Sequence, residues 1–152
     1  SGPIAVAKRE YLARRDPDDA ATRDEFMKLW VRAEVGRLTN IRASQNRKLG
    51  DPGPEGSVAK LAMAELNKDI LSFAVDAMGP EGMLYDTYDI ARNASAGMFG
   101  GSTQQSFLRA QANSIEGGTT EVMKNILGER VLGLPGDIRV DKDKPWSQIP
   151  RS

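Results

Sequence analysis

The sequence predicts an all-α fold, an antiparallel up-and-down helical bundle, and three observations carry this prediction. Apolar residues recur every three or four positions over long stretches, and breaks rich in glycine and proline separate those stretches. No run of residues has the alternating pattern of a strand, and aromatic residues make up only 6% of the chain. We expect a bundle domain over residues 1–135 and an extended polar tail over residues 136–152.

Two long amphipathic helices are predicted in the first half of the chain. The first should begin with Thr22 and Glu25 as a capping box and end near Lys48. Its expected core stripe consists of Met27, Val31, Val35 and Leu38, widened by Phe26, Trp30 and Ala33. The second should run over residues 57–78, with a stripe of Ala62, Leu66, Ile70, Phe73 and Ala77.

Shorter segments complete the predicted bundle. Further helical segments are expected over residues 1–15, 89–98, 103–114 and 121–132. Thr119 or Thr120 can cap the last of them, directly after the break at Gly117 and Gly118. Gly133 and Pro135 should end it.

Composition excludes several classes of chemistry. The chain has no cysteine and no histidine, so disulfides, thiol nucleophiles, Cys/His metal sites and imidazole bases are impossible. Lys and Arg total 21, as do Asp and Glu, and this zero balance predicts no nucleic-acid partner. No apolar run approaches the roughly 18 residues of a membrane span. We therefore expect a cytoplasmic protein that neither crosses nor binds a membrane.

The segment from residue 109 to 135 carries the functional signal. It reads RAQANSIEGGTTEVMKNILGERVLGLP and closely resembles the last helix pair of acyl-CoA dehydrogenases. The closing sequence PWSQIPRS is similar to the tails of bacterial members. The resemblance covers most of this chain but only a minority of the family's usual length. It implies a helical C-terminal domain that lacks the helical and β domains which normally precede it, so the chain alone should be inactive.

The family resemblance implies an activity and its participants. Members remove hydrogen from the α and β carbons of an acyl-CoA thioester, with a glutamate as base and FAD as hydride acceptor. A bacterial lipid or steroid side-chain pathway and electron-transfer flavoprotein as acceptor are also implied. Glu116 is the candidate catalytic base. Three alternatives remain open: Glu116 itself, a base on an earlier helix that is largely missing here, or a catalytically silent subunit.

Candidate cofactor contacts also follow from the resemblance. Gly118, Thr119 and Glu121 match positions that approach the flavin. Gly79 and Gly82 match a glycine-rich loop that contacts the adenine half of FAD across a subunit interface. In that loop Asp76 and Pro80 depart from the family's glutamine and glycine, and proline cannot donate a backbone N–H.

Assembly is the last expectation from the resemblance. The family's C-terminal domain drives oligomer formation, so we expect a homo-oligomer or a hetero-oligomer with a related subunit. The competing interpretation is a non-catalytic subunit of a hetero-oligomeric dehydrogenase, or a helical interaction module. When Gly118 and Thr119 are aligned with the family's Gly-Thr pair, the position of the catalytic glutamate falls on Gly117, one residue after Glu116. The departures at Asp76, Pro80 and Gly117 favour this alternative.

Overall fold

The computed structural model of the chain describes residues 2–50, 53–85, 101–136 and 145–149, and every regular element in them is helical. The α-helices are α1 (Pro3–Arg14), α2 (Ala20–Lys48), α3 (Glu55–Ala77), α4 (Thr103–Gln111) and α5 (Thr120–Arg130). The 3-10 segments are η1 (Gly79–Met83), η2 (Ala112–Ser114) and η3 (Trp146–Gln148). The predicted all-α fold is confirmed. The helix expected over residues 89–98 lies outside the described residues.

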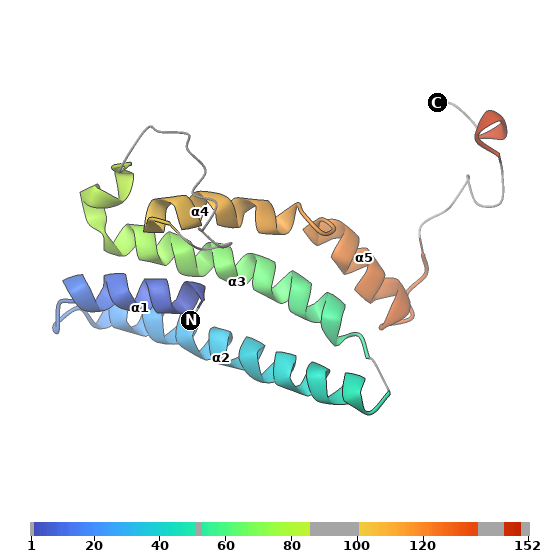
Figure 1. Ribbon diagram of the computed structural model, residues 1–152, viewed down its shortest axis with the longest axis horizontal. Coiled ribbons are helices and arrows are strands. Elements are labelled where there is room, and N and C mark those ends of the chain that lie inside the picture. Colours follow the sequence, from blue (N-terminus) through green and yellow to red (C-terminus); the bar gives the residue numbers. More distant parts are fainter. Residues whose placement is uncertain (1, 51–52, 86–100, 137–144, 150–152) are drawn as a thin grey trace.

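Helix α3 is the centre of the bundle. It contacts α1, α2, α4 and α5, which lie along its sides (Figure 1). Helices α2 and α3 form a long antiparallel pair, while α1 is much shorter and lies beside both of them at one end. Because α1 has 12 residues and α2 has 29, much of the α2–α3 pair extends beyond α1.

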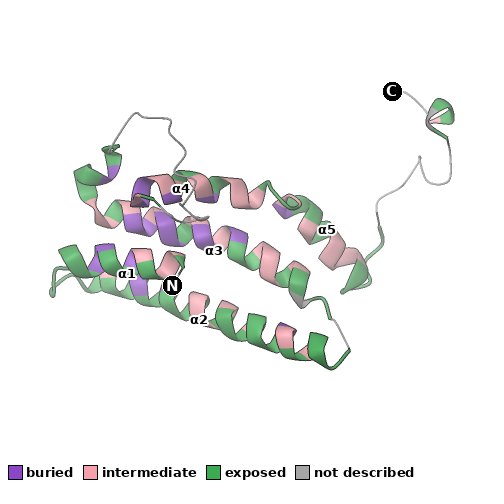
Figure 2. Cartoon of the chain, in the orientation of Figure 1, coloured by how far each residue is buried: buried purple, intermediate pink, exposed green. Residues whose placement is uncertain are grey.

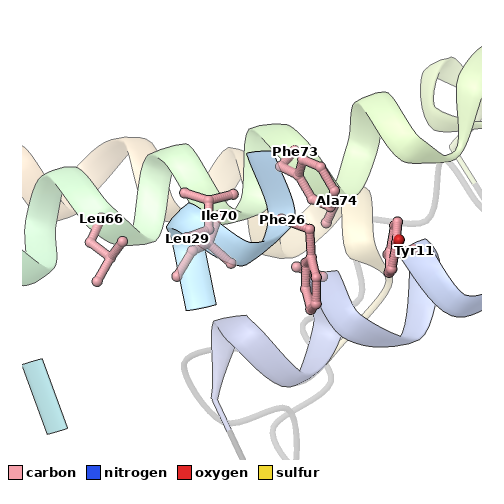
Figure 3. Close-up of a cluster of buried hydrophobic side chains, with 8 residues drawn as sticks. Tyr11, Phe26, Leu29, Leu66, Ile70, Phe73 and Ala74 are labelled. Carbon is pink, nitrogen blue, oxygen red and sulfur yellow. The ribbon is translucent and has the colours of Figure 1, made fainter. Parts of the chain in front are cut away.

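The hydrophobic core lies where α1 covers the α2–α3 pair. Tyr11 stacks on Phe26 with ring centroids 4.7 Å apart, and Phe73 packs against both rings (Figure 3). Ile70 and Leu71 on α3 are the largest fully buried side chains among the described residues. Each such burial stabilises the fold by about 1.5–3 kcal/mol. Figure 2 shows the buried positions concentrated in this half of the molecule.

The predicted core stripe of α2 is wrong for its four central residues, and Trp30, expected to widen the stripe, is also 37% exposed. Met27, Val31, Val35 and Leu38 are between 48% and 57% exposed. The buried residues of α2 include Phe26 and Leu29, which are only 6% and 5% exposed. Helix α2 is apolar on two faces, and helical periodicity alone cannot choose between them. The contacts with α1 and α3 decide which face is buried.

The predicted capping box at Thr22 and Glu25 is also wrong. Asp19 caps α2, and its two carboxylate oxygens accept hydrogen bonds from the backbone N–H of Thr22 (2.9 Å) and from its hydroxyl (2.6 Å). An aspartate at this position satisfies a free N–H and places negative charge at the positive end of the helix dipole. The Thr22 hydrogen bonds lower the pKa of Asp19.

A buried carboxylate ties α1 to the rest of the bundle. Glu10 accepts hydrogen bonds from Arg9, Arg14 and the Thr103 hydroxyl, at 2.7 to 3.0 Å. Arg14 also donates to Glu81 in η1. Burial would raise the pKa of Glu10, but these hydrogen bonds outweigh it and lower the pKa. The cluster joins α1 to α4 and η1.

The remaining boundaries lie close to the predicted ones. Helix α3 begins two residues earlier than expected, and the helix predicted over residues 103–114 is divided into α4 and η2. Ser102 and Gln105 form a capping box at the start of α4. In the part of the chain that the structure describes, no helix combines the length and the apolar character needed to cross a membrane.

Candidate functional site

The candidate site is the break between α4 and α5, residues 115–119. Gly117 and Gly118 adopt φ values of 64° and 98°, a backbone region that side chains rarely tolerate. Thr119 then caps α5, and its side-chain oxygen accepts from the N–H of Val122 at 3.2 Å. This confirms one of the two predicted caps. The two glycines turn the chain between the end of η2 at Ser114 and the start of α5 at Thr120.

The break is anchored on α3 by polar side chains. The Lys60 ammonium donates hydrogen bonds to the carbonyl oxygens of Asn113, at 2.9 Å, and Gly118. The Thr120 hydroxyl donates to Glu65 at 3.0 Å. Lys60 therefore binds the chain at both ends of the break and fixes the position of the break relative to α3.

Glu116 lies at the start of the break as an exposed, paired carboxylate. One of its oxygens accepts from the guanidinium of Arg109 at 2.8 Å, and the other accepts from the amide of Asn113 at 2.9 Å. The side chain is 45% exposed. The hydrogen bond from Arg109, followed by that from Asn113, lowers the pKa of Glu116 below its ordinary value. Glu116 is thus ionised at neutral pH in this arrangement.

Arg109 has a feature that its ion pair does not explain. Its Nη2 atom binds Glu116, while its Nη1 atom is buried and has no hydrogen-bond partner among the described residues. A buried guanidinium N–H without an acceptor is costly. An added acceptor beside α4 would remove that cost.

Thr119 and Glu121 line an apolar groove of about 1030 Å³ between α2, α3 and α5. Val31, Val35, Ala62, Leu66, Val58 and Ile115 provide its apolar walls. Leu66 belongs to both the core and this groove, so the groove continues the core beyond the end of α1. This explains why Ala62, a predicted core residue, is exposed.

Gly79 and Gly82 lie far from the break. They belong to η1, at the opposite end of α3 from Lys60 (Figure 1). The 19 residues from Lys60 to Gly79 correspond to about 28 Å of helix. Glu116, Gly118, Thr119 and Glu121 are therefore brought together, whereas Gly79 and Gly82 are not part of the same site within one chain.

The two η1 glycines have structural reasons of their own. Gly79 adopts a φ of 62° in open space. Gly82 is buried, and a Cβ added there would lie 2.5 Å from the carbonyl oxygen of Val75 on α3. Gly82 is needed for the close approach of η1 to α3. Its role in cofactor binding stays a prediction.

The family model of the acyl-CoA dehydrogenase C-terminal domain matches residues 5–132, from α1 to just beyond α5. The chain belongs to the acyl-CoA dehydrogenase family. The match includes the whole break and both helices that flank it. The all-helical fold of the chain is consistent with the C-terminal domain of this family.

Individual relatives agree with this membership. The acyl-CoA dehydrogenases IpdE1 of Mycobacterium tuberculosis and Mycolicibacterium smegmatis are 29% and 28% identical to this chain over 139 residues. The aligned region is 91% of this chain but only 32% and 31% of those relatives. The chain thus spans about a third of the length of the curated relatives it matches.

A solved structure supports the fold. A chain of the protein described as the Tcur3481-Tcur3483 steroid ACAD superimposes with a TM-score of 0.72 and 16% sequence identity. The superposition covers 89% of this chain and 35% of the other. At this level of identity, the likeness shows the fold alone.

Sequence reasoning missed three residues that shape the site: Lys60, Arg109 and Asn113. The seven-residue separation of Arg109 and Glu116, about two helical turns, could have indicated that they lie on one face. Asn113 lies three residues before Glu116, a spacing at which helical side chains meet. Nothing local marks Lys60, because its contacts lie 53 and 58 residues away.

Proposed function

We propose that this chain is the helical C-terminal part of an FAD-dependent enzyme that dehydrogenates acyl-CoA thioesters between Cα and Cβ. The observation that carries the proposal is the family match over residues 5–132, which includes the glycine break. The break has two properties that the active site for such a reaction needs. Its glycines permit close approach of a ligand to the backbone, and α5 begins there with N–H groups directed outward.

The break fits one part of an FAD cofactor better than another. The first turn of α5 offers backbone donors and the Thr119 hydroxyl, whereas the buried Thr120 hydroxyl already donates to Glu65. The same turn also contains the carboxylate of Glu121. A negative charge there disfavours a phosphate and leaves the uncharged, oxygen-bearing portion of the cofactor as the better neighbour. Bound FAD would supply the hydride acceptor. Gly118 and Thr119 would position it, and Glu121 would border it.

Glu116 is the base in this proposal, and its environment defines what must change. A general base works best when its pKa lies near the working pH. The pKa of Glu116 is instead lowered by Arg109 and Asn113. In the assembled enzyme the carboxylate would have to leave Arg109 and become less hydrated, and both changes raise its pKa.

A second candidate function is a catalytically silent subunit of the same family. The specific observation that favours it is the pairing of both Glu116 oxygens, which leaves the carboxylate ionised and bound. In this case the break would retain its shape for assembly, and a related subunit would provide the base.

We also infer that the enzyme is assembled from more than one polypeptide. Gly79 and Gly82 lie about 28 Å of helix away from the break, so a cofactor that contacts both groups would bridge two chains. The description of the solved neighbour contains two names, Tcur3481 and Tcur3483. A related acyl-CoA dehydrogenase subunit is the proposed partner, electron-transfer flavoprotein the proposed acceptor, and the cytoplasm the proposed compartment.

The test uses the full-length enzyme, or the complex that contains this chain, with FAD bound. Anaerobic bleaching of the flavin is followed after adding straight-chain acyl-CoAs and a CoA thioester with a steroid-derived acyl group. The variants are Glu116→Gln and, as a matched control, Glu34→Gln, which removes an exposed, paired carboxylate on α2. Flavin reduction by the wild type supports the enzyme class.

The extent of flavin bleaching in Glu116→Gln distinguishes the two candidate functions. Loss of bleaching in Glu116→Gln, with flavin content retained and the control active, would make Glu116 the base. Unchanged bleaching would assign the base to another segment and favour the silent subunit. An assembled protein that binds no flavin and bleaches none with any thioester would overturn the proposed function.

A further inference from the structure

Lys60 on α3 directs its positive charge at the backbone of the break rather than at a carboxylate. Its ammonium donates to the carbonyl oxygens of Asn113 and Gly118, and it forms no ion pair within the described part of the chain. By contrast, the ammonium of Lys28 pairs with Asp24 at 2.6 Å. Lys60 is half-buried, so water screens its charge less than that of an exposed lysine. The charge of Lys60 therefore acts mainly on the peptide groups that it binds.

The carbonyl of Gly118 belongs to the peptide unit that leads into α5. A trans peptide is planar, and its C=O and N–H bonds point in opposite directions. Because Lys60 binds the Gly118 carbonyl, the N–H of the same unit, which is that of Thr119, points away from the ammonium. The Thr119 N–H has no acceptor among the described residues, and Thr119 is the cap of α5. The break therefore has a backbone donor whose direction Lys60 fixes.

Lys60 also makes this donor stronger. A hydrogen bond from an ammonium to a carbonyl draws electron density from the peptide unit, so the N–H of that unit becomes a better donor. Hydrogen bonds in such a chain strengthen one another by about 10–30% per bond. Donors that are held in place before a ligand arrives need no reorganisation when it binds or reacts. The Thr119 N–H is thus both oriented and polarised from the side opposite to an incoming ligand.

The charge of Lys60 also acts on other groups of the break. A Cβ added at Gly117 would lie 3.8 Å from the Cε atom of Lys60, so the lysine side chain lies directly beside this glycine. The pKa of Glu116 is lowered first by Arg109 and then by Asn113, and the charge of Lys60 contributes further to the lowering. The ammonium therefore influences the break as a whole and not a single carbonyl.

We propose that Lys60 is a positioning residue of the candidate site, which orients and polarises the Thr119 N–H toward an uncharged oxygen of the cofactor. An uncharged oxygen is the expected acceptor because the carboxylate of Glu121 in the same turn disfavours a phosphate. This inference rests on the proposed function, in which Gly118 and Thr119 position FAD. It adds a residue that touches neither cofactor nor substrate and acts from α3 through the backbone.

The first test measures the polarisation by NMR in the 152-residue chain. Lys60→Met removes the charge and both hydrogen bonds but keeps an unbranched side chain of similar length. The carbonyl carbon resonance of Gly118 and the amide nitrogen resonance of Thr119 should both move upfield, because the carbonyl loses a charged donor. Lys60→Arg should keep both resonances closer to those of the wild type. Lys28→Met, which removes an exposed lysine of α2, should leave them unchanged.

The second test measures the dissociation constant of FAD for the full-length enzyme, or for the complex that contains this chain. Lys60→Met should weaken FAD binding about fivefold, the change expected for one hydrogen bond, and Lys60→Arg should restore part of the loss. Lys28→Met should bind FAD as the wild type does. Circular dichroism verifies that the variants remain helical, and Lys60→Gln, which keeps a neutral donor, replaces Lys60→Met if that variant unfolds.

The outcomes separate this inference from the proposed function. A wild-type enzyme that binds no FAD would overturn both of them. If the wild type binds FAD and is bleached by a thioester, an unchanged FAD affinity in Lys60→Met, or an equal loss in Lys28→Met, would overturn this inference alone. Resonances of Gly118 and Thr119 that do not move in Lys60→Met would also overturn it, because the lysine would then not polarise the peptide unit.

Discussion

Replacing Glu10 by glutamine should destabilise the bundle far more than the same change at an exposed site. The Glu10 side chain is only 9% exposed and receives four hydrogen bonds, from Arg9, Arg14 and Thr103. Loss of one partner in a fully buried ion pair costs about 3–5 kcal/mol. Arg9 and Arg14 are partly exposed and can turn toward water, which reduces the expected cost to about 2 kcal/mol.

That magnitude is measurable in this chain. For a domain of about 150 residues, 2 kcal/mol lowers Tm by about 4–8 °C. Thermal and urea unfolding at pH 7, followed by circular dichroism, compare Glu10→Gln with the exposed control Glu34→Gln. A cost at Glu10 no greater than that at Glu34 would refute the reasoning that burial makes this cluster important.

The pH dependence provides an independent measure of the same cluster. The pKa of Glu10 is lowered in the folded chain relative to its ordinary value of 4.5. Its stabilising contribution is therefore complete above pH 4.5 and is lost as pH falls through the lowered pKa. The difference in stability between wild type and Glu10→Gln should shrink in that acid range. A constant difference from pH 7 to pH 3 would contradict the assignment.

Three further predictions concern the ends of the bundle and the break. Gly82→Ala should destabilise the chain by more than about 1 kcal/mol because the added Cβ would collide with a carbonyl oxygen of α3. Gly36→Ala, in open space within α2, should instead stabilise the chain by about 0.5–1 kcal/mol. Urea unfolding measures both changes in the free energy of unfolding. Lys60→Met should speed hydrogen exchange of the amides of residues 113–118 while leaving α1 protected, since it removes the anchor of the break. Arg109→Gln should raise the pKa of Glu116 in an NMR titration, because the guanidinium is the largest cause of its lowering, and an unchanged pKa would remove Arg109 from that role.

The sequence predicted the helical elements well because their signals are local. The α3 stripe of Leu66, Ile70 and Phe73 is buried as expected, and Thr119 caps α5. The break was located from two adjacent glycines, both of which adopt positive φ. These features depend on periodicity and on backbone chemistry within a few residues, and both can be read along the chain.

The errors arose where two local patterns competed. Both Thr22 and Asp19 can cap a helix, and the carboxylate of Asp19 does so while also accepting from the Thr22 hydroxyl. On α2 two apolar faces have the same period, and only the position of α1 shows that Phe26 and Leu29 face the core. The second face includes Val31 and Val35, which line the groove between α2, α3 and α5 rather than the core.

The site was harder to predict than the fold because its contacts are long-range. Lys60 holds the break from α3, and no nearby residue pattern announces this contact. The family resemblance assigns Gly79 and Gly82 to the adenine half of FAD across a subunit interface, and helix α3 separates them from the break within one chain. Sequence spacing shows which residues lie at each end of a helix. It does not show which helix ends bind the same ligand.

The difference in length between α1 and the α2–α3 pair explains why an apolar groove lies beside the candidate site. Helix α1 covers the α2–α3 pair only over its 12 residues, and the core stripe of α3 continues past it through Leu66 to Ala62. The surface beyond α1 is therefore built like a core but lacks a covering element among the described residues. The break, with Thr119 and Glu121, lies along the edge of this same surface. The groove and the edge of the break thus share one surface, and any element that covers this surface meets both of them. Glu116 itself does not line the groove, so its pKa would rise toward the range that a base requires only if the covering element also displaced Arg109 or removed water from the carboxylate.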